Sequence, residues 1–206
     1  MIRFIWLAAW VVFLFAATAI ASEQTKIDGF GVAKWGMLKK DIMAIEGAPS
    51  DIDKNTGEIT YNDKMVMGKK TIVRYQFEAG CNDFDISQCR FSDGQYLFSE
   101  ASKEFFSQME ETLTTKYGLS TKTTTSTKSY PTMATTGKCE IETQTSERIS
   151  GKAAIKFTRE CSLYDFTSKL TNKDVKAGTC RAGIFYYGPY HYKTFSKKKN
   201  TQDRGL

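Results

Sequence analysis

The chain has one histidine and three prolines among its 206 residues, and it lacks the motifs of several common enzyme classes. No G-x-S-x-G elbow is present, so a Ser/His/Asp or Cys/His apparatus would have to be built around His191 alone. No C-x2-C pair, P-loop or G-x-G-x-x-G at a strand-to-helix turn occurs, which argues against a structural zinc site and against nucleotide chemistry. We therefore expect a protein that is not an enzyme and that has no catalytic residue, metal or cofactor.

Long apolar runs are also absent, except at the start of the chain. Residues 1–21 read MIRFIWLAAWVVFLFAATAIA, with Arg3 before the run and the small residues Ala19 and Ala21 before Ser22. This pattern is typical of a signal peptide that is cleaved near Ala21. The alternative is an uncleaved anchor, because the run is at the short end of what spans a bilayer. We expect a periplasmic or secreted protein.

The rest of the chain has the composition of one folded domain. The formal net charge is +6, and 41% of the residues are hydrophobic and 13% aromatic, which is enough apolar surface to form a core. We expect a single α+β domain over residues 22–192. A polar, basic tail over residues 193–206 is too hydrophilic to fold by itself.

Two amphipathic helices are predicted from apolar residues that recur every three or four positions. The first helix is short and is closed by Gly47. Its apolar positions are Leu38, Ile42 and Ile45. The second helix covers residues 100–117, with Ser99 as its N-cap. Its apolar positions are Ala101, Phe105, Phe106, Met109, Leu113 and Tyr117.

Alternating runs at 69–77 and 153–161 predict strands with one face on a core. Asp93-Gly94 is a hairpin signal, and the Ser- and Thr-rich segment 120–136 reads as an edge strand that continues into a loop. We expect a two-layer fold, with a curved antiparallel sheet and both helices on one face. The expected core joins Phe105, Met109 and Leu113 to Val73, Tyr75 and Phe77, with Trp35 at the junction of helix and sheet.

Five cysteines fit export to an oxidising compartment. Cys81 and Cys89 bracket a polar loop and are candidates for a local disulfide. Cys139 and Cys161 are equally far from the middle of a turn-like segment, so they face each other if the flanking runs form a hairpin. The competing pairing joins Cys161 to Cys180 and leaves Cys139 alone, and the sequence does not choose between the two.

Two regions are candidate binding surfaces. The loop between the first two cysteines would present Phe84 and Ile86 on a covalently closed rim. Near the end of the chain, Tyr187, Tyr190 and His191 lie in an aromatic run that is followed by lysines, a combination that suits glycans or anionic headgroups.

One segment resembles a calcium-binding loop. Asp51, Asp53 and Asn55 alternate as oxygen ligands would, but the glycine comes one position late, at Gly57, and Asn62 stands where a bidentate glutamate is needed. A turn that leads into a strand explains the pattern equally well.

The start of the domain, GFGVAKWGM, resembles a group of small exported bacterial proteins of uncharacterised function that open with F-G-x-x-W-G-M. The matching residues are Phe30, Gly31, Trp35, Gly36, Met37, Gly47, Pro49, Tyr61, Gly68, Tyr75, Phe77, Lys116, Tyr117 and Gly118. Leu38 departs from the pattern, because a small hydroxyl residue is expected there, and the cysteine-closed loop is not part of it. In its order of elements the chain is also similar to β-lactamase-inhibitor-protein-like and outer-membrane-assembly-lipoprotein-like modules, a resemblance that implies binding to other proteins.

The expected function is therefore that of an exported, non-enzymatic protein that contacts another protein of the cell envelope. Export argues against a nucleic-acid partner. The alternative is a small-ligand or glycan binder, or an enzyme, that uses the aromatic region around His191. In a third interpretation, Lys193 and the lysines at 197–199 make a weak contact with an anionic membrane surface.

Overall fold

The structure is a computed structural model that describes residues 25–78, 89–131, 138–168 and 173–189. Its elements are β1 (Gly29–Phe30), β2 (Ala33–Lys34), α1 (Lys39–Glu46), β3 (Asp51–Ile52), β4 (Ile59–Val66), β5 (Lys69–Phe77), β6 (Phe91–Phe98), α2 (Lys103–Tyr117), β7 (Lys122–Pro131), β8 (Lys138–Ser150), β9 (Ala153–Ser168) and β10 (Lys173–Tyr187). None of the described helices is long and apolar enough to cross a bilayer.

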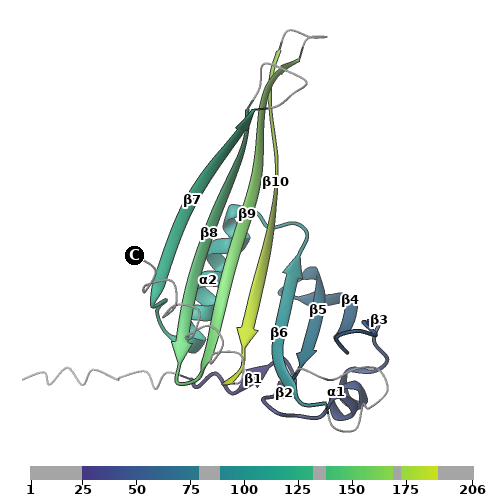
Figure 1. Cartoon of the computed structure of the whole chain (residues 1–206). Coiled ribbons are helices and arrows are strands. Elements are labelled where there is room, and N and C mark those ends of the chain that lie inside the picture. Colours follow the sequence, from purple (N-terminus) through teal and green to yellow (C-terminus); the bar gives the residue numbers. More distant parts are fainter. Residues whose placement is uncertain (1–24, 79–88, 132–137, 169–172, 190–206) are drawn as a thin grey trace, which may run out of the picture.

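Eight strands form one antiparallel sheet in the order β3-β4-β5-β6-β10-β9-β8-β7, and β1 pairs with β2 in a separate small hairpin (Figure 1). Helix α1 contacts the sheet where Glu46 accepts a hydrogen bond from Tyr75, and α2 contacts it where Phe106 stacks on Phe157. The strand register places Tyr75 and Phe157 on the same face. The predicted α+β fold, with a curved sheet and two helices on one face, is confirmed.

Helix α1 ends at Gly47, as predicted, in a left-handed conformation with φ +88°. Its buried face differs from the predicted stripe, because Ile45 is 57% exposed whereas Ile42 is fully buried. The helix is rotated so that Lys39 and Glu46 also face inward, and Glu46 binds partners on the sheet.

Helix α2 begins three residues later than predicted. The side chain of Ser102, rather than Ser99, caps it by accepting a hydrogen bond from the backbone N–H of Phe105 at 3.1 Å. Gly118 ends the helix. The predicted apolar stripe is buried throughout, at Ala101, Phe105, Phe106, Met109, Leu113 and Tyr117.

Helix α2 lies over a different part of the sheet from the one that we expected. It lies along β8 and β9 (Figure 1). Phe106 meets Phe157 of β9, Tyr117 meets Tyr186 of β10, and the helix also reaches β6, where Phe105 meets Phe98. Tyr75 and Phe77, which we expected to meet this helix, instead pack on Phe30 of the β1–β2 hairpin and on Phe91 of β6.

Trp35 anchors the β1–β2 hairpin to the sheet rather than joining a helix to it. Its ring stacks on that of Phe91 with centroids 5.2 Å apart, and its Nε1–H donates to the carbonyl of Ile27 at 3.0 Å. The start motif of the domain therefore forms part of the core.

The predicted hairpin at Asp93-Gly94 is wrong, since both residues lie inside β6. Gly94 is needed for a different reason: a Cβ atom at this position would lie 2.2 Å from the ring of Phe30. Asp93 is buried, and its carboxylate accepts hydrogen bonds from the Ser92 hydroxyl and the Gly188 N–H.

The Ser- and Thr-rich segment forms β7, an edge strand of the sheet as predicted, up to Pro131; residues 132–137 lie outside the described part. The side chains of residues 122–130 are exposed. Two lysines and the terminal proline are residue types that protect an open edge from pairing with other chains.

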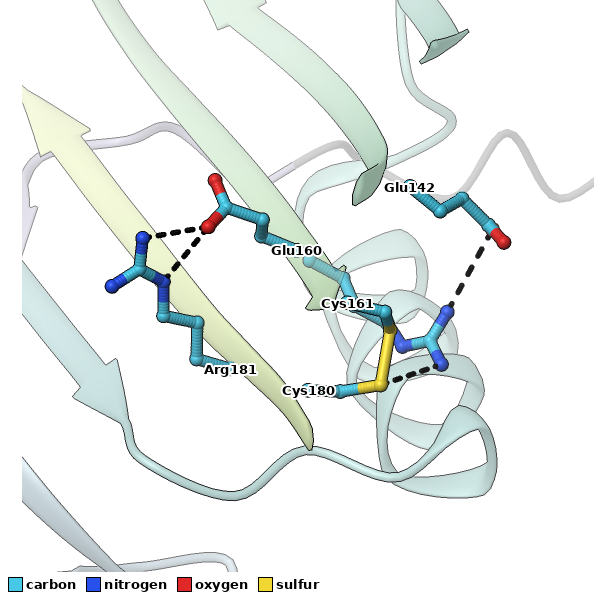
Figure 2. The surroundings of a disulfide bond; sticks show 6 residues. Glu142, Glu160, Cys161, Cys180 and Arg181 are labelled. Atoms are coloured by element: carbon cyan, nitrogen blue, oxygen red, sulfur yellow. Dashed lines mark hydrogen bonds and ion pairs between the residues drawn. A yellow bond between two sulfur atoms is a disulfide. The ribbon is translucent and has the colours of Figure 1, made fainter. Parts of the chain in front are cut away.

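Cys161 and Cys180 form a disulfide between β9 and β10 (Figure 2). They lie directly opposite each other, with Cα atoms 4.0 Å apart. Cys139 is free, and Cys89 is disulfide-bonded, whereas its expected partner Cys81 lies outside the described residues. A structural disulfide indicates an oxidising compartment outside the cytoplasm.

The alternative pairing of Cys139 with Cys161 is wrong because of the position of one turn. The β8–β9 turn is formed by Gly151 and Lys152, whereas the symmetric arrangement needs Ser150 at its centre. Cys139 therefore lies opposite Tyr164, which is three positions after Cys161, and Cys161 lies opposite Glu142, which is three positions after Cys139. An odd offset places them on opposite faces of the sheet.

Candidate functional site: the open face of the sheet

The face of the sheet opposite the helices has no covering layer within the described residues (Figure 1). Strand β5 shows the division between the two faces. Its core residues are Thr71, Val73, Tyr75 and Phe77. Ile72, Arg74 and Gln76 alternate with them on the open face and are half-buried. Ile72 is the apolar one of these three open-face residues of β5, and it marks the position of the candidate site.

A hollow of about 560 Å³ lies on this face at the centre of the sheet. Its apolar lining includes Ile72, Leu97, Gly183 and Phe185. Ile72 is the register partner of Leu97, which is in turn the partner of Gly183. Three strands, β5, β6 and β10, therefore build one apolar patch.

A second hollow of about 410 Å³ adjoins the first and reaches the β4–β5 hairpin. The two share Ile72, Leu97 and Ser99 in their linings. We call them together the open-face groove. Its combined size is that of sites that accept a ligand or a few side chains of a partner.

Gly183 deepens the groove because it has no side chain. A Cβ atom there would lie 2.8 Å from the ring of Phe185, which covers this position. The ring of Phe185 lies nearly parallel to that of Tyr187, with centroids 6.5 Å apart. Burial, together with the charges of Asp93 and Glu147, raises the pKa of Tyr187 to about 12.

Ion pairs flank both ends of the groove. At one end Arg181 donates from Nη2 and Nε to Glu160 Oε1, at 2.6 and 3.1 Å (Figure 2). At the other end Lys70 Nζ lies 3.3 Å from Asp63 Oδ1. Arg181, Lys70 and Asp63 are largely exposed, so these pairs are weak and can exchange for the charges of a partner.

The structure places one of the predicted binding residues on the open face. Tyr187, at the end of β10, lies beside the groove. Phe84, Ile86, Tyr190 and His191 lie outside the described residues.

Sequence reasoning missed the central lining residues. The signal was present in two places: Ile72 is apolar at a position that alternation assigns to solvent, and Phe185 lies between two core residues of β10. Glu160 and Arg181 carry no signal of their own, since their pairing depends on the β9–β10 register.

The segment that resembles a calcium loop forms the turn between β3 and β4. Asp53 Oδ1 accepts hydrogen bonds from the backbone N–H groups of Asn55 and Thr56, at 2.8 and 3.2 Å. These bonds lower the pKa of Asp53. The carboxylate therefore organises the turn. In the part of the chain that the structure describes, no three Cys, His, Asp or Glu side chains gather as metal ligands would.

Comparisons of this chain with protein-family models, with curated proteins and with solved structures found no match.

Proposed function

We propose that this chain is an exported, non-enzymatic binding protein that acts by contacting another protein of the cell envelope through its open-face groove. The observation that carries the proposal is an apolar patch, formed by Ile72, Leu97 and Phe185, at the centre of an uncovered sheet face. An apolar centre with a charged rim is the common anatomy of a protein-binding surface.

Two features support the export part of the proposal. Residues 1–21 have the pattern of a signal peptide, and the Cys161–Cys180 disulfide fits the periplasm or the exterior. The resemblance to small exported bacterial proteins points in the same direction. Membership of that group of proteins remains a prediction.

Photo-crosslinking in intact cells tests the groove. A photoreactive amino acid replaces Leu97 or Phe185 in the full chain, and Glu111, on the exposed side of α2, is the matched control position. We expect both groove positions to crosslink to the same envelope protein and the control position to give no such product. The mass of the recovered chain shows whether it begins at Ser22.

A second experiment introduces a charged side chain into the groove. Leu97→Glu places a carboxylate on the apolar patch, and it should abolish the crosslink formed from Phe185 without unfolding the chain, because Leu97 is only half-buried. Crosslinking that is equal at Glu111 and at the groove, or absent from the groove, would contradict the proposal.

A second candidate function is binding of a glycan or another small ligand beside Phe185 and Tyr187 on the open face. The nearly parallel rings of Phe185 and Tyr187 favour it, because flat aromatic faces stack on sugar rings. His191→Ala separates this candidate from the first. A ligand site or an enzyme built around the single histidine should lose binding or activity, whereas protein crosslinking from Leu97 should persist.

A further inference from the structure

The hairpin of β4 and β5 exposes two methionines, one at the end of β4 and one in the turn. Met65 is 64% exposed and Met67 is 47% exposed. Single exposed apolar residues are ordinary, but two flexible apolar side chains at the end of one hairpin make a compact apolar tip. We call residues 63–70, which read DKMVMGKK, the hairpin tip.

The backbone holds Met67 in an unfavourable conformation. Met67 has φ +49° and Gly68 has φ +73°, so both central residues of the turn are left-handed. This geometry suits Asn-Gly and disfavours a bulky residue. Among the described residues, Asp63 and Met67 are the two non-glycine residues with positive φ, and both belong to the hairpin tip. Folding alone does not call for methionine here, since asparagine fits the turn better.

Lysines accompany the apolar side chains on both faces of the hairpin. Met65 pairs with Lys70 and Val66 pairs with Lys69. Cross-strand partners share a face, and consecutive pairs lie on opposite faces. Each face of the tip therefore presents one exposed lysine, beside the exposed Met65 on one face and beside Val66, which packs against the core, on the other.

The tip is positively charged, with three lysines and one aspartate in residues 63–70. The aspartate, Asp63, pairs with Lys70 at 3.3 Å, and both side chains are more than 70% exposed, so this pair is weak. Lys64 binds Glu46 at 2.7 Å, which fixes the base of the hairpin to α1.

We propose that the hairpin tip is a membrane-contact element that inserts Met65 and Met67 into the headgroup region of an anionic lipid surface. Lysines on both faces then meet lipid phosphates around the inserted tip. This two-sided arrangement suits a wedge that is surrounded by headgroups, whereas a protein partner would be met by a one-sided patch. The tip adjoins the open-face groove, because Asp63 and Lys70 line one end of it, but Met65 and Met67 are not among its lining residues. The inference therefore rests on these two methionines and not on the groove.

Vesicle co-sedimentation tests the proposal with the exported form of the chain, from Ser22 to Leu206. The probes are vesicles of equal parts phosphatidylglycerol and phosphatidylcholine, compared with vesicles of phosphatidylcholine alone. We expect the wild-type chain to prefer the anionic vesicles and the double variant Met65→Ser, Met67→Asn to bind them about tenfold more weakly. All variants begin at Ser22, so the apolar run of residues 1–21 is absent, and all share residues 190–206, whose contribution is the same in each.

Two controls isolate the tip. Leu119→Ser removes an apolar side chain that is 80% exposed at the end of α2, and it should leave vesicle binding unchanged. Lys69→Gln should weaken binding to the anionic vesicles alone, and added salt should reduce the difference. Because asparagine tolerates the left-handed conformation, Met67→Asn should unfold at the same urea concentration as the wild type or higher.

Three results would overturn the proposal. The wild-type chain could fail to sediment with anionic vesicles, the double variant could sediment as well as the wild type, or Leu119→Ser could lose as much binding as the tip variants. A tip variant that loses a protein crosslink, in a chain that ignores vesicles, would assign the tip to a protein partner instead.

Discussion

Both halves of the sheet have apolar cores that contain aromatic rings, but they differ in what else is buried there. The aromatic half consists of β3 to β6 with α1 and the β1–β2 hairpin. The helix-backed half consists of β7 to β10 with α2, and its strands extend well beyond the end of that helix (Figure 1). The contrast shows which kind of change each half can tolerate.

The aromatic half is packed around Phe30. Four rings surround this side chain, with centroids 4.4 to 6.3 Å away, and they belong to Tyr75, Phe91, Tyr96 and Tyr186. Rigid rings at these distances leave no space for added atoms. This half should therefore be most sensitive to an increase in volume.

The helix-backed half adds a buried charge to its apolar core. Arg148 of β8 is 1% exposed and donates to Glu110 Oε1 at 2.5 Å, to the Gly118 carbonyl at 2.9 Å and to the Thr114 hydroxyl at 2.9 Å. It also donates to the Ser146 hydroxyl at 3.2 Å. One guanidinium therefore ties the last turns of α2 to the sheet, and this half should be most sensitive to the loss of a charge.

Arg148→Met should have the largest effect. Methionine keeps much of the volume but leaves Glu110 and the carbonyl of Gly118 without their donor. We expect the free energy of unfolding to fall by about 3 kcal/mol, the low end for a broken buried pair, because the Glu110 side chain is 28% exposed and can be rehydrated. Urea unfolding followed by circular dichroism measures the change.

The control is a second arginine on the same sheet. Arg181→Met breaks the exposed pair with Glu160 and should cost less than about 1 kcal/mol. If the two variants lost equal stability, the buried hydrogen bonds and ion pair of Arg148 would not stabilise the helix-backed half more than an exposed ion pair does.

Gly94→Ala should have an intermediate effect, in the aromatic half. The added methyl group would lie 2.2 Å from the ring of Phe30. We expect a loss of about 2 kcal/mol from overpacking, again measured by urea unfolding.

The double variant Phe30→Leu, Gly94→Ala sharpens this prediction. Leucine is smaller and can move away from the new methyl group, so the double variant should lose about 1 kcal/mol less than the sum of the two single changes. Strict additivity would show that the contact with Phe30 is not the reason for the glycine.

Helix faces and helix ends could be predicted from the sequence, because they depend on residues a few positions apart. Phe105, Met109 and Leu113 recur at helical spacing and are buried, and Gly47 ends its helix at a positive φ. The α+β class and the edge strand follow from the same kind of pattern.

What could not be predicted depends on contacts between distant segments. Asp93-Gly94 has the composition of a turn, but Phe30, more than sixty positions away, makes the glycine a packing requirement. The groove exists because Leu97 meets Gly183 across β6 and β10, and no local pattern specifies that register.

The burial of Arg148 could not be predicted from the sequence for a related reason. Arg148 occurs in a polar strand and reads as exposed until α2 brings Glu110 to it. The cysteine pairing similarly depends on a turn at Gly151 and Lys152, only slightly displaced from the symmetric position.

Glu46→Gln should lose less stability than Arg148→Met or Gly94→Ala. The aromatic half also contains a charged group that contacts its core, the carboxylate of Glu46. The carboxylate accepts hydrogen bonds from Tyr75 at 2.6 Å and Lys64 at 2.7 Å. Burial alone would raise the pKa of Glu46, but these two bonds outweigh it and the pKa lies below its ordinary value of 4.5. We expect a loss of about 1 kcal/mol at pH 7, the difference between charged and neutral hydrogen bonds.

The pH dependence identifies the charge as the cause. Because the pKa of Glu46 is lower in the folded state, its contribution to stability is present above pH 4.5 and is lost as the pH falls through the folded-state value. The gap between wild type and Glu46→Gln, measured by urea unfolding, should therefore narrow from pH 7 to pH 3. Glu111→Gln, which removes the same charge from the exposed side of α2, should show no such narrowing. A gap that stayed constant with pH would mean that the shape of the side chain, and not its charge, holds α1 to the aromatic half.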